Sequence, residues 1–170
     1  DAVIIASPDH LHYEPAKKAL AMGYNVLLEK PMSNNVNETY QLGKLAEEND
    51  RVFMICHVLR YTPFFKKIKE LIDTDVIGDV VSIQHNENIG YYHMAHSFVR
   101  GNWRNTEESS PIILAKSCHD MDILHFLVGA KAKTLASFGK LSHFKSDQKP
   151  ENATDRCKDC SLKETCIYSA

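Results

Sequence analysis

The chain has 170 residues, of which 44% are hydrophobic and 25% charged, and its formal net charge at pH 7 is −2. This length suits one domain or one and a half, and the apolar content is sufficient for a buried core. The small net charge, without a long basic or acidic run, argues against binding to nucleic acid or to a membrane surface, and no apolar run approaches the roughly 18 residues of a transmembrane helix.

Strands and helices alternate in residues 1–77. Short apolar runs are typical of buried parallel strands, and apolar residues at helical spacing predict the helices between them. The predicted strands are 1–7, 24–30 and 51–59, and the predicted helices are 12–23, 34–50 and 62–73. Asn35 and Glu38 have the spacing of a capping box at the start of the second helix. The alternation predicts an α/β fold in which crossover helices connect the strands of a parallel sheet.

The pattern changes after Gly78, and we place a domain boundary near Ile77. Beyond it comes a long extended stretch that no helix follows, and then a polar segment. We expect an extended segment at 79–92, a polar segment at 93–110, a helix at 110–129, a strand at 133–144 and a polar, cysteine-rich tail. Pro111 lies near the start of the predicted helix and Gly129 just past its end, where these residue types are favoured.

Polar side chains follow all three predicted strands at their carboxyl ends. Ser7 follows the first strand, Lys30 ends the second, and the stretch from His57 to Arg60 ends the third. Because ligands of parallel α/β sheets bind outside the carboxyl ends of the strands, these residues are candidates for one shared site. A lysine that is partly removed from water there can hydrogen-bond a reacting hydroxyl and take part in proton transfer, and a cis bond to Pro31 would aim it. The alternative is an ordinary surface lysine that closes a strand.

Residues 1–33 resemble part of the Gfo/Idh/MocA family, which includes glucose–fructose oxidoreductase and inositol dehydrogenase. In that family a strand, Ser-Pro or Thr-Pro, a His four residues after the Pro, a helix with Ala-Leu, a Gly and a second strand lead to Glu-Lys-Pro. The matching residues here are Ser7, Pro8, His12, Ala16, Ala19, Leu20, Gly23, Glu29, Lys30 and Pro31. The resemblance continues through 60–83, 101–104 and 116–129, so it covers nearly the whole chain.

The resemblance implies a fold and a function. Residues 1–77 would be the C-terminal half of an NAD(P)-binding domain, with a partial Rossmann-type parallel sheet. Residues 78–170 would be the N-terminal part of an α+β substrate and oligomerisation domain, with a mainly antiparallel sheet. Members of the family transfer hydride between the nicotinamide of NAD or NADP and a hydroxyl-bearing carbon, usually of a sugar, a cyclitol or a related small molecule. We therefore expect NAD or NADP as cofactor, a sugar-like substrate and a homo-oligomer.

The resemblance also implies roles for individual residues. Lys30 would contact the substrate and the nicotinamide ribose, and His119 would exchange a proton with the substrate hydroxyl. Asp122 lies three residues after His119, on the same helical face, and is expected to orient or charge its imidazole. Many members carry an Asp four residues before this His, where the chain has Ala115. Either Lys116 substitutes for that acid or the proton relay is shorter.

Further residues match positions near the cofactor or the substrate. Trp103 can equally be a packing anchor, because a Trp in a polar loop often is. His93, His96 and Arg100 are candidates for lining a polyol or carboxylate pocket. His85 receives no role in the site. The expected cofactor-binding residues are Ser7, Pro8, His12, Glu29, Lys30, Pro31, Arg60, Trp103 and Arg104.

The sequence contains no G-x-G-x-x-G turn, the motif that seats the pyrophosphate of a dinucleotide on backbone N–H groups. In an intact relative this motif precedes the first strand that is present here. We therefore expect the chain to be an internal piece of a longer enzyme. By itself the piece is expected to bind neither NAD nor NADP measurably and to show no turnover.

Cys157, Cys160 and Cys166 are spaced C-x2-C-x5-C in the polar tail. One interpretation is a structural zinc site with these three thiolates and His143 as the fourth ligand. The other is three reduced thiols in a cytoplasmic protein, because no secretory leader is visible and a disulfide is then less favoured. A cofactor-free binding or regulatory module with such a zinc loop is the alternative to a dehydrogenase.

Overall fold

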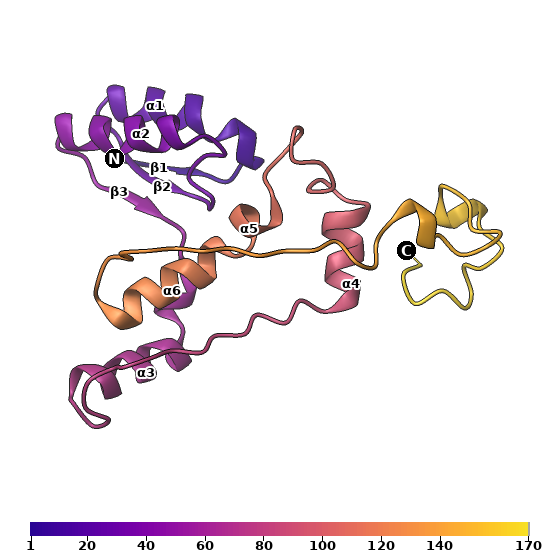
Figure 1. The fold of residues 1–170 in the computed structure, drawn as a ribbon. Coiled ribbons are helices and arrows are strands. Elements are labelled where there is room, and N and C mark those ends of the chain that lie inside the picture. The colour runs from indigo at the N-terminus through magenta and orange to yellow at the C-terminus, as the bar shows by residue number, and fades with distance from the viewer. Residues whose placement is uncertain (170) are drawn as a thin grey trace.

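The computed structural model describes residues 1–169. Their N-terminal part is a three-stranded parallel sheet with two helices on one face (Figure 1). The strands are β1 (Ala2–Ile5), β2 (Asn25–Leu28) and β3 (Phe53–Ile55), in the order β1-β2-β3, and the helices are α1 (Tyr13–Ala21) and α2 (Val36–Glu48). Val3 pairs with Val26, and Val26 pairs with Phe53. The predicted α/β fold with a parallel sheet is confirmed.

The core of this part lies between the sheet and its two helices. Leu20 of α1, Leu28 of β2 and Leu42 of α2 are fully buried there, among smaller apolar side chains. Burial of each leucine stabilises the fold by about 1.5–3 kcal/mol. Successive residues of a strand point to opposite faces, so Ile5 is buried under the helices whereas Ile4 is 72% exposed. The helices thus fix the sheet from one face and leave its carboxyl ends free to build a site.

The start of α2 shows how local hydrogen bonds set a helix boundary. The Asn35 side chain accepts the backbone N–H of Asn37 (2.9 Å), which confirms Asn35 as the cap. The predicted capping box is wrong, because the Glu38 carboxylate accepts the hydroxyl of Ser33 and not the Asn35 N–H. Ser33 accepts that N–H itself (3.0 Å), so a serine before the helix completes the cap.

The second part is more open and combines short helices with extended segments (Figure 1). The predicted helix at 110–129 is divided at Lys116 and Ser117, and its second half ends at Gly129, whose φ is +66°. Short 3₁₀ turns lie at Asp9–Leu11, Val58–Tyr61, Ser146–Gln148 and Cys157–Asp159. The α- and π-helices of this part are α3 (Pro63–Asp73), α4 (Tyr91–His93), a π-helix (Met94–Val99), α5 (Ile112–Ala115) and α6 (Cys118–Val128).

Two extended segments cross the second part without forming a sheet. Residues 79–90 run from the end of α3 to α4, and residues 130–142 run from α6 toward the C-terminal loop (Figure 1). Within residues 1–169 neither segment pairs as a strand, so the antiparallel sheet and the strand predicted at 133–144 are not confirmed. An extended segment becomes a strand only when a neighbour satisfies its N–H and C=O groups.

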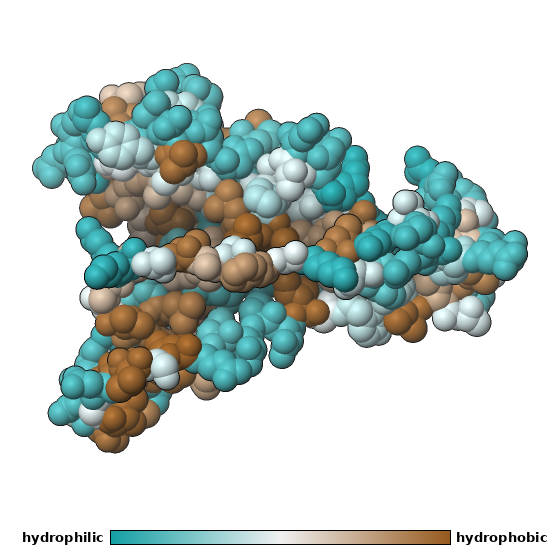
Figure 2. All heavy atoms as spheres, viewed as in Figure 1, coloured by the Kyte–Doolittle hydropathy of each residue, from teal (hydrophilic) through white to brown (hydrophobic). Residues whose placement is uncertain are grey.

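Apolar side chains are exposed on the second part. Figure 2 shows hydrophobic residues gathered around α3, while the helices over the sheet are mainly hydrophilic. Phe64 of α3 is 68% exposed, and Val81 and Phe138 of the extended segments are 94% and 97% exposed. No helix within residues 1–169 is both long and apolar enough to cross a membrane.

Gly101 packs against the backbone of the π-helix, and this gives a first prediction. A Cβ at this position would meet the carbonyl oxygens of His96 and Ser97, the second at 2.8 Å. Because backbone atoms cannot swing aside, Gly101→Ala is expected to lower the free energy of unfolding by about 1–3 kcal/mol. Gly43 inside α2 is the matched control, since its Cβ would meet nothing within 4 Å.

Gly43→Ala is expected to raise the free energy of unfolding by up to about 1 kcal/mol, because Ala is the better helix former. Urea unfolding of the two variants measures both changes. Changes of the same sign at the two glycines would contradict this account of Gly101.

Candidate active site

A cavity of 720 Å³ opens at the carboxyl ends of the strands, between the sheet and the loop after the π-helix. Trp103 spans its two sides, because the indole Nε1 donates a hydrogen bond to the Asp9 carboxylate (3.0 Å). Trp103 thus connects the two sides of the cavity and also lines it. Its position is compatible both with a packing anchor and with a residue that contacts the cofactor. The predicted cofactor-binding residues that line the cavity are Ser7, Pro8, Glu29, Lys30, Trp103 and Arg104.

His12 supports the cavity from behind its wall. The imidazole is fully buried, and its two nitrogens lie 2.7 Å from the carbonyl oxygen of Pro31 and 2.8 Å from that of Ser7. It therefore holds the loops that follow β1 and β2 together. His12 does not line the cavity, so its predicted contact with the cofactor stays a prediction. The Lys30–Pro31 peptide bond is cis, as the sequence suggested.

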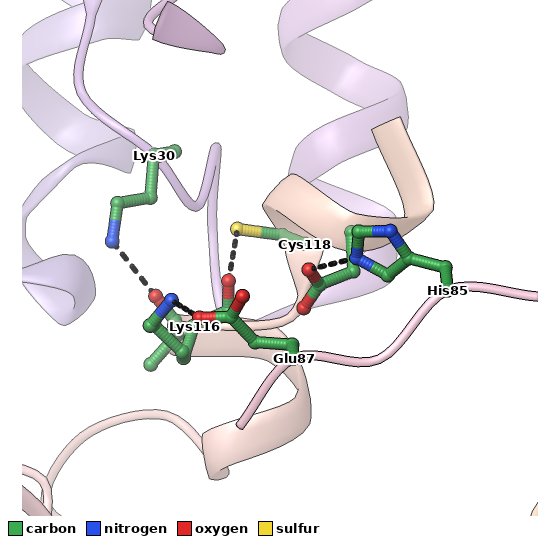
Figure 3. A network of polar contacts seen from close by, with 7 residues as sticks. Lys30, His85, Glu87, Lys116 and Cys118 are labelled. Carbon is green, nitrogen blue, oxygen red and sulfur yellow. Dashed lines mark hydrogen bonds and ion pairs between the residues drawn. The ribbon is translucent and has the colours of Figure 1, made fainter. Parts of the chain in front are cut away.

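Lys30 reaches from the end of β2 to the second part of the chain. Its Nζ donates a hydrogen bond to the backbone carbonyl of Ala115 at the end of α5 (2.8 Å), as Figure 3 shows. Ala115 is the position at which the resemblance described above implies an acid. Here the backbone supplies an oxygen acceptor for the lysine where the side chain cannot.

His119 lies in the first turn of α6, next to Lys30, although it is not among the residues that line the cavity. Burial lowers the pKa of His119, and the charges of Lys30, His57 and Lys116 lower it further, while Asp120 opposes them. The Nδ1 atom is buried and has no hydrogen-bond partner among the described residues. The site therefore favours a neutral imidazole, which can accept a proton.

Asp122 does not contact His119 as predicted, because Arg60 binds its carboxylate. The guanidinium of Arg60 donates two hydrogen bonds to it, Nε to Oδ2 at 2.7 Å and Nη2 to Oδ1 at 2.6 Å. This bidentate bond raises the pKa of the guanidinium. Arg60 is likewise engaged by Asp122 and does not line the cavity. The pair fastens α6 to the 3₁₀ turn after β3.

The Arg60–Asp122 pair leads to a second prediction. Asp122→Asn removes the charged acceptor, whose side chain is only 10% exposed, and leaves the guanidinium without its counter-ion. We expect the free energy of unfolding to fall by about 1.5–3 kcal/mol. The control is Glu48→Gln, which breaks an exposed pair with Lys44 and is expected to cost at most about 0.5 kcal/mol. Equal losses in urea unfolding would contradict a structural role for Asp122.

A polar network that sequence reasoning missed borders the site. His85 Nε2 lies 2.8 Å from Asp120 Oδ1, and Lys116 pairs with Glu87 (Figure 3). Alternation along an extended segment places His85 and Glu87 on the same side, and this was the one signal available in the sequence. The position of that segment against α6 is a long-range contact that the sequence pattern did not contain.

The same network contains a group of potential metal ligands. The ligand atoms of His85, Glu87 and Asp120 lie within 4.8 Å of one another, and no other such group occurs in the described part of the chain. Its members already have polar partners within the network, because Lys116 pairs with Glu87 and the His85 ring bonds the Asp120 carboxylate. The network therefore links residues 79–90 to α6 and to Lys116 just before it.

The residues predicted to bind zinc do not come together. Among residues 1–169, Cys157, Cys160, Cys166 and His143 form no group of ligand atoms within that distance of one another. The ring of His143 instead bonds the hydroxyl of Tyr168 (2.9 Å). A zinc site in this loop stays a prediction, and the geometry does not support it.

The three residues proposed for a polyol or carboxylate pocket lie on the π-helix and its flanks. His93 stacks on Phe98, with ring centroids 5.9 Å apart, and His96 stacks on Tyr92 at 5.8 Å. Arg100 bonds the backbone carbonyl of Tyr168. None of the three lines the cavity, so their predicted role gains no support.

Two family models match the chain. One, described as an oxidoreductase family with an NAD-binding Rossmann fold, matches residues 1–57, and the other, described as the C-terminal alpha/beta domain of that family, matches residues 69–164. The chain belongs to the Gfo/Idh/MocA oxidoreductase family. The β1–β3 sheet thus corresponds to part of the Rossmann fold of the Gfo/Idh/MocA proteins. The predicted boundary near Ile77 falls inside the second match and stays a prediction.

Individual Gfo/Idh/MocA proteins match over most of the chain. It is 31% identical to YteT of Bacillus subtilis, over 99% of the chain and 40% of YteT. It is 30% identical to 2,7-anhydro-N-acetylneuraminate hydratase of Mediterraneibacter gnavus, over 82% of the chain and 36% of that protein. The crystal structure of scyllo-inositol dehydrogenase from Lactobacillus casei, with bound NAD(H) and scyllo-inositol, matches with a TM-score of 0.62 and 25% identity, over 76% of this chain and 37% of that one. The chain thus spans about two fifths of the length of these Gfo/Idh/MocA relatives.

Proposed function

We propose that the chain is part of a longer NAD(P)-dependent oxidoreductase that transfers hydride between nicotinamide and a hydroxyl-bearing carbon of a sugar, a cyclitol or a related small molecule. The observation that carries this proposal is the convergence of Lys30 and His119 beside a cavity at the carboxyl ends of a parallel sheet. Relatives named for scyllo-inositol and for 2,7-anhydro-N-acetylneuraminate support the substrate class.

The residues of the cavity fit the nicotinamide end of a dinucleotide. The Lys30 ammonium offers hydrogen-bond donors suited to ribose hydroxyls, and Trp103 offers an aromatic face. The Ser7 hydroxyl, which donates to the Leu11 carbonyl (3.2 Å), offers an acceptor. When bound, the nicotinamide supplies the acceptor or donor of hydride. The chain itself supplies the groups that hold the substrate oxygen and move its proton.

Two side chains divide that work. In the oxidising direction the Lys30 ammonium donates a hydrogen bond to the substrate oxygen, which stabilises the negative charge that grows there as the proton leaves. His119 accepts the hydroxyl proton, because its environment keeps the ring neutral. Its Nδ1 is enclosed, so Nε2 is the nitrogen that takes the proton. In the reducing direction the same nitrogen returns it.

The test uses the full-length protein with a panel of cyclitols, sugars and sugar acids. Each compound is mixed with NAD⁺ or NADP⁺, and the absorbance of the reduced nicotinamide is followed. We expect reduction of one cofactor with at least one compound of the panel, and cofactor binding in calorimetry. A folded full-length protein that binds neither cofactor would contradict the proposal. Light scattering on the same sample tests the expected homo-oligomer.

The cofactor-free module with a structural zinc loop is not favoured. The chain belongs to an oxidoreductase family, and the three cysteines with His143 do not converge. The same calorimetry tests this alternative. A cofactor-free module would bind neither NAD nor NADP, whereas binding of either nucleotide would exclude it.

A further inference from the structure

His57 lies close to two residues of α6 and belongs to neither the cavity wall nor the Arg60–Asp122 pair. It follows β3, and its ring meets the ring of His119 in a T-shaped contact, with centroids 5.9 Å apart and planes at 81°. Its Nε2 is also 3.9 Å from Asp122 Oδ1. The imidazole is thus near both His119 and the Asp122 carboxylate.

The ring of His119 is held by packing and not by a hydrogen bond at Nδ1. This atom is buried and unpartnered among the described residues, and so is the Nδ1 atom of His57. A triad histidine is usually oriented by an acceptor on its second nitrogen. Here Asp122 is taken by Arg60, and Ala115 has no polar side chain to offer. The T-shaped contact with the His57 ring is the aromatic contact that remains to orient His119.

The charges around the two rings favour different protonation states. Around His119 stand Lys30, His57 and Lys116, which oppose a positive charge, and Asp120, which favours one. Burial also lowers the pKa of His57, but there the Asp122 carboxylate raises it against Lys30 and Arg60. Two imidazolium ions this close, with Lys30 beside both, would repel each other. A proton shared by the pair is therefore better placed on His57, next to Asp122.

We infer that His57 is a positioning residue for His119: it fixes the plane of the ring and, as the pH falls, is protonated before His119. The role in catalysis rests on the proposed function, because it assumes that His119 accepts the substrate proton. The contact between the rings and their coupled titration do not rest on it. The two can therefore be tested separately.

The first arm of the test is a titration that needs no substrate. The full-length protein is labelled with ¹³C-histidine, and the His119 signal, assigned with His119→Gln, is followed by NMR against pH. In His57→Phe a neutral ring of similar shape remains, so we expect the titration midpoint of His119 to move to higher pH. His125→Phe, at an exposed position of α6, is the control and should leave the midpoint in place.

The second arm is kinetic. In His57→Ala, which removes the ring, we expect kcat to fall about 10–100-fold through loss of alignment. In His57→Phe, which keeps a ring, we expect a smaller loss of kcat and an acid limb of the kcat/KM profile that moves to higher pH. If His57→Phe does not fold, His57→Gln serves instead, since it cannot titrate and still donates toward Asp122; the same upward movement is expected. An unchanged His119 midpoint in the folded variant would overturn the inference. If the titration midpoint of His119 moves in His57→Phe but the full-length protein has no dehydrogenase activity, the coupling between the two rings is supported and the proposed function is refuted.

Discussion

Lys30→Ala in the full-length enzyme is expected to lower kcat by about 10²–10⁴-fold, the range typical of losing a positioned acid–base group. The ammonium is the one positive side chain that both lines the cavity and bonds the end of α5. Without it, negative charge on the substrate oxygen would develop with no facing cation, and α5 would lose its contact with the sheet. Steady-state kinetics with the substrate identified by the panel measures the loss.

The control for Lys30 is Lys18→Ala. Lys18 is an exposed lysine of α1 that does not line the cavity, so kcat should stay within experimental error. Circular dichroism of both variants separates a catalytic loss from unfolding. A folded Lys30→Ala enzyme with near-normal kcat would remove Lys30 from the mechanism.

His119→Ala is also expected to lower kcat by about 10²–10⁴-fold, while cofactor binding stays largely intact. The neutral ring is the active form in the oxidising direction, so activity is lost as pH falls through the pKa of His119. Burial and then Lys30 lower that pKa, and the acid limb of kcat/KM is therefore expected below about 6.5, the ordinary histidine value. An acid limb above that value, or a fully active His119→Ala variant, would contradict the assignment.

The same shift has a consequence for stability. The pKa values of His57 and His119 are lowered in the folded protein, both chiefly by burial. Below about 6.5 the unfolded chain therefore binds protons that the folded chain does not, and the free energy of unfolding falls as pH decreases from there. Urea unfolding at a series of pH values measures this slope, and His57→Phe should reduce it.

The strand and helix pattern of residues 1–77 could be predicted from the sequence because each element carries its own local signal. The hydrophobic periodicity and the capping residues of an element lie within that element, so β1–β3, α1 and α2 could be predicted. The carboxyl ends of the predicted strands then indicated Lys30 as a site residue. The same local signals did not predict the division between α5 and α6, because Lys116 and Ser117 are both compatible with a continuing helix.

The partners of the site residues could not be predicted, since they depend on contacts distant in the sequence. The spacing between His119 and Asp122 is correct for one helical face. The Asp122 carboxylate nevertheless binds Arg60, which lies 62 residues earlier in the sequence. His12 shows the same limit. Its register matched the family motif, but only the fold shows that the ring is enclosed and bridges two loops.

The bond between Lys30 and Ala115 ends on a main-chain oxygen, and this changes how position 115 responds to mutation. Any side chain that α5 tolerates leaves the acceptor in place, so saturation mutagenesis of residue 115 would record packing effects and miss the contact with the lysine altogether. The acceptor is altered only by changing the backbone. Semisynthesis with an α-hydroxy acid at residue 116 turns the Ala115–Lys116 amide into an ester, whose carbonyl is a weaker acceptor. Because the ester also removes the Lys116 N–H that donates to the Ile112 carbonyl (2.9 Å), the same change is made in Lys30→Ala. The difference between the two backgrounds is the part due to the lysine contact, which genetics cannot reach.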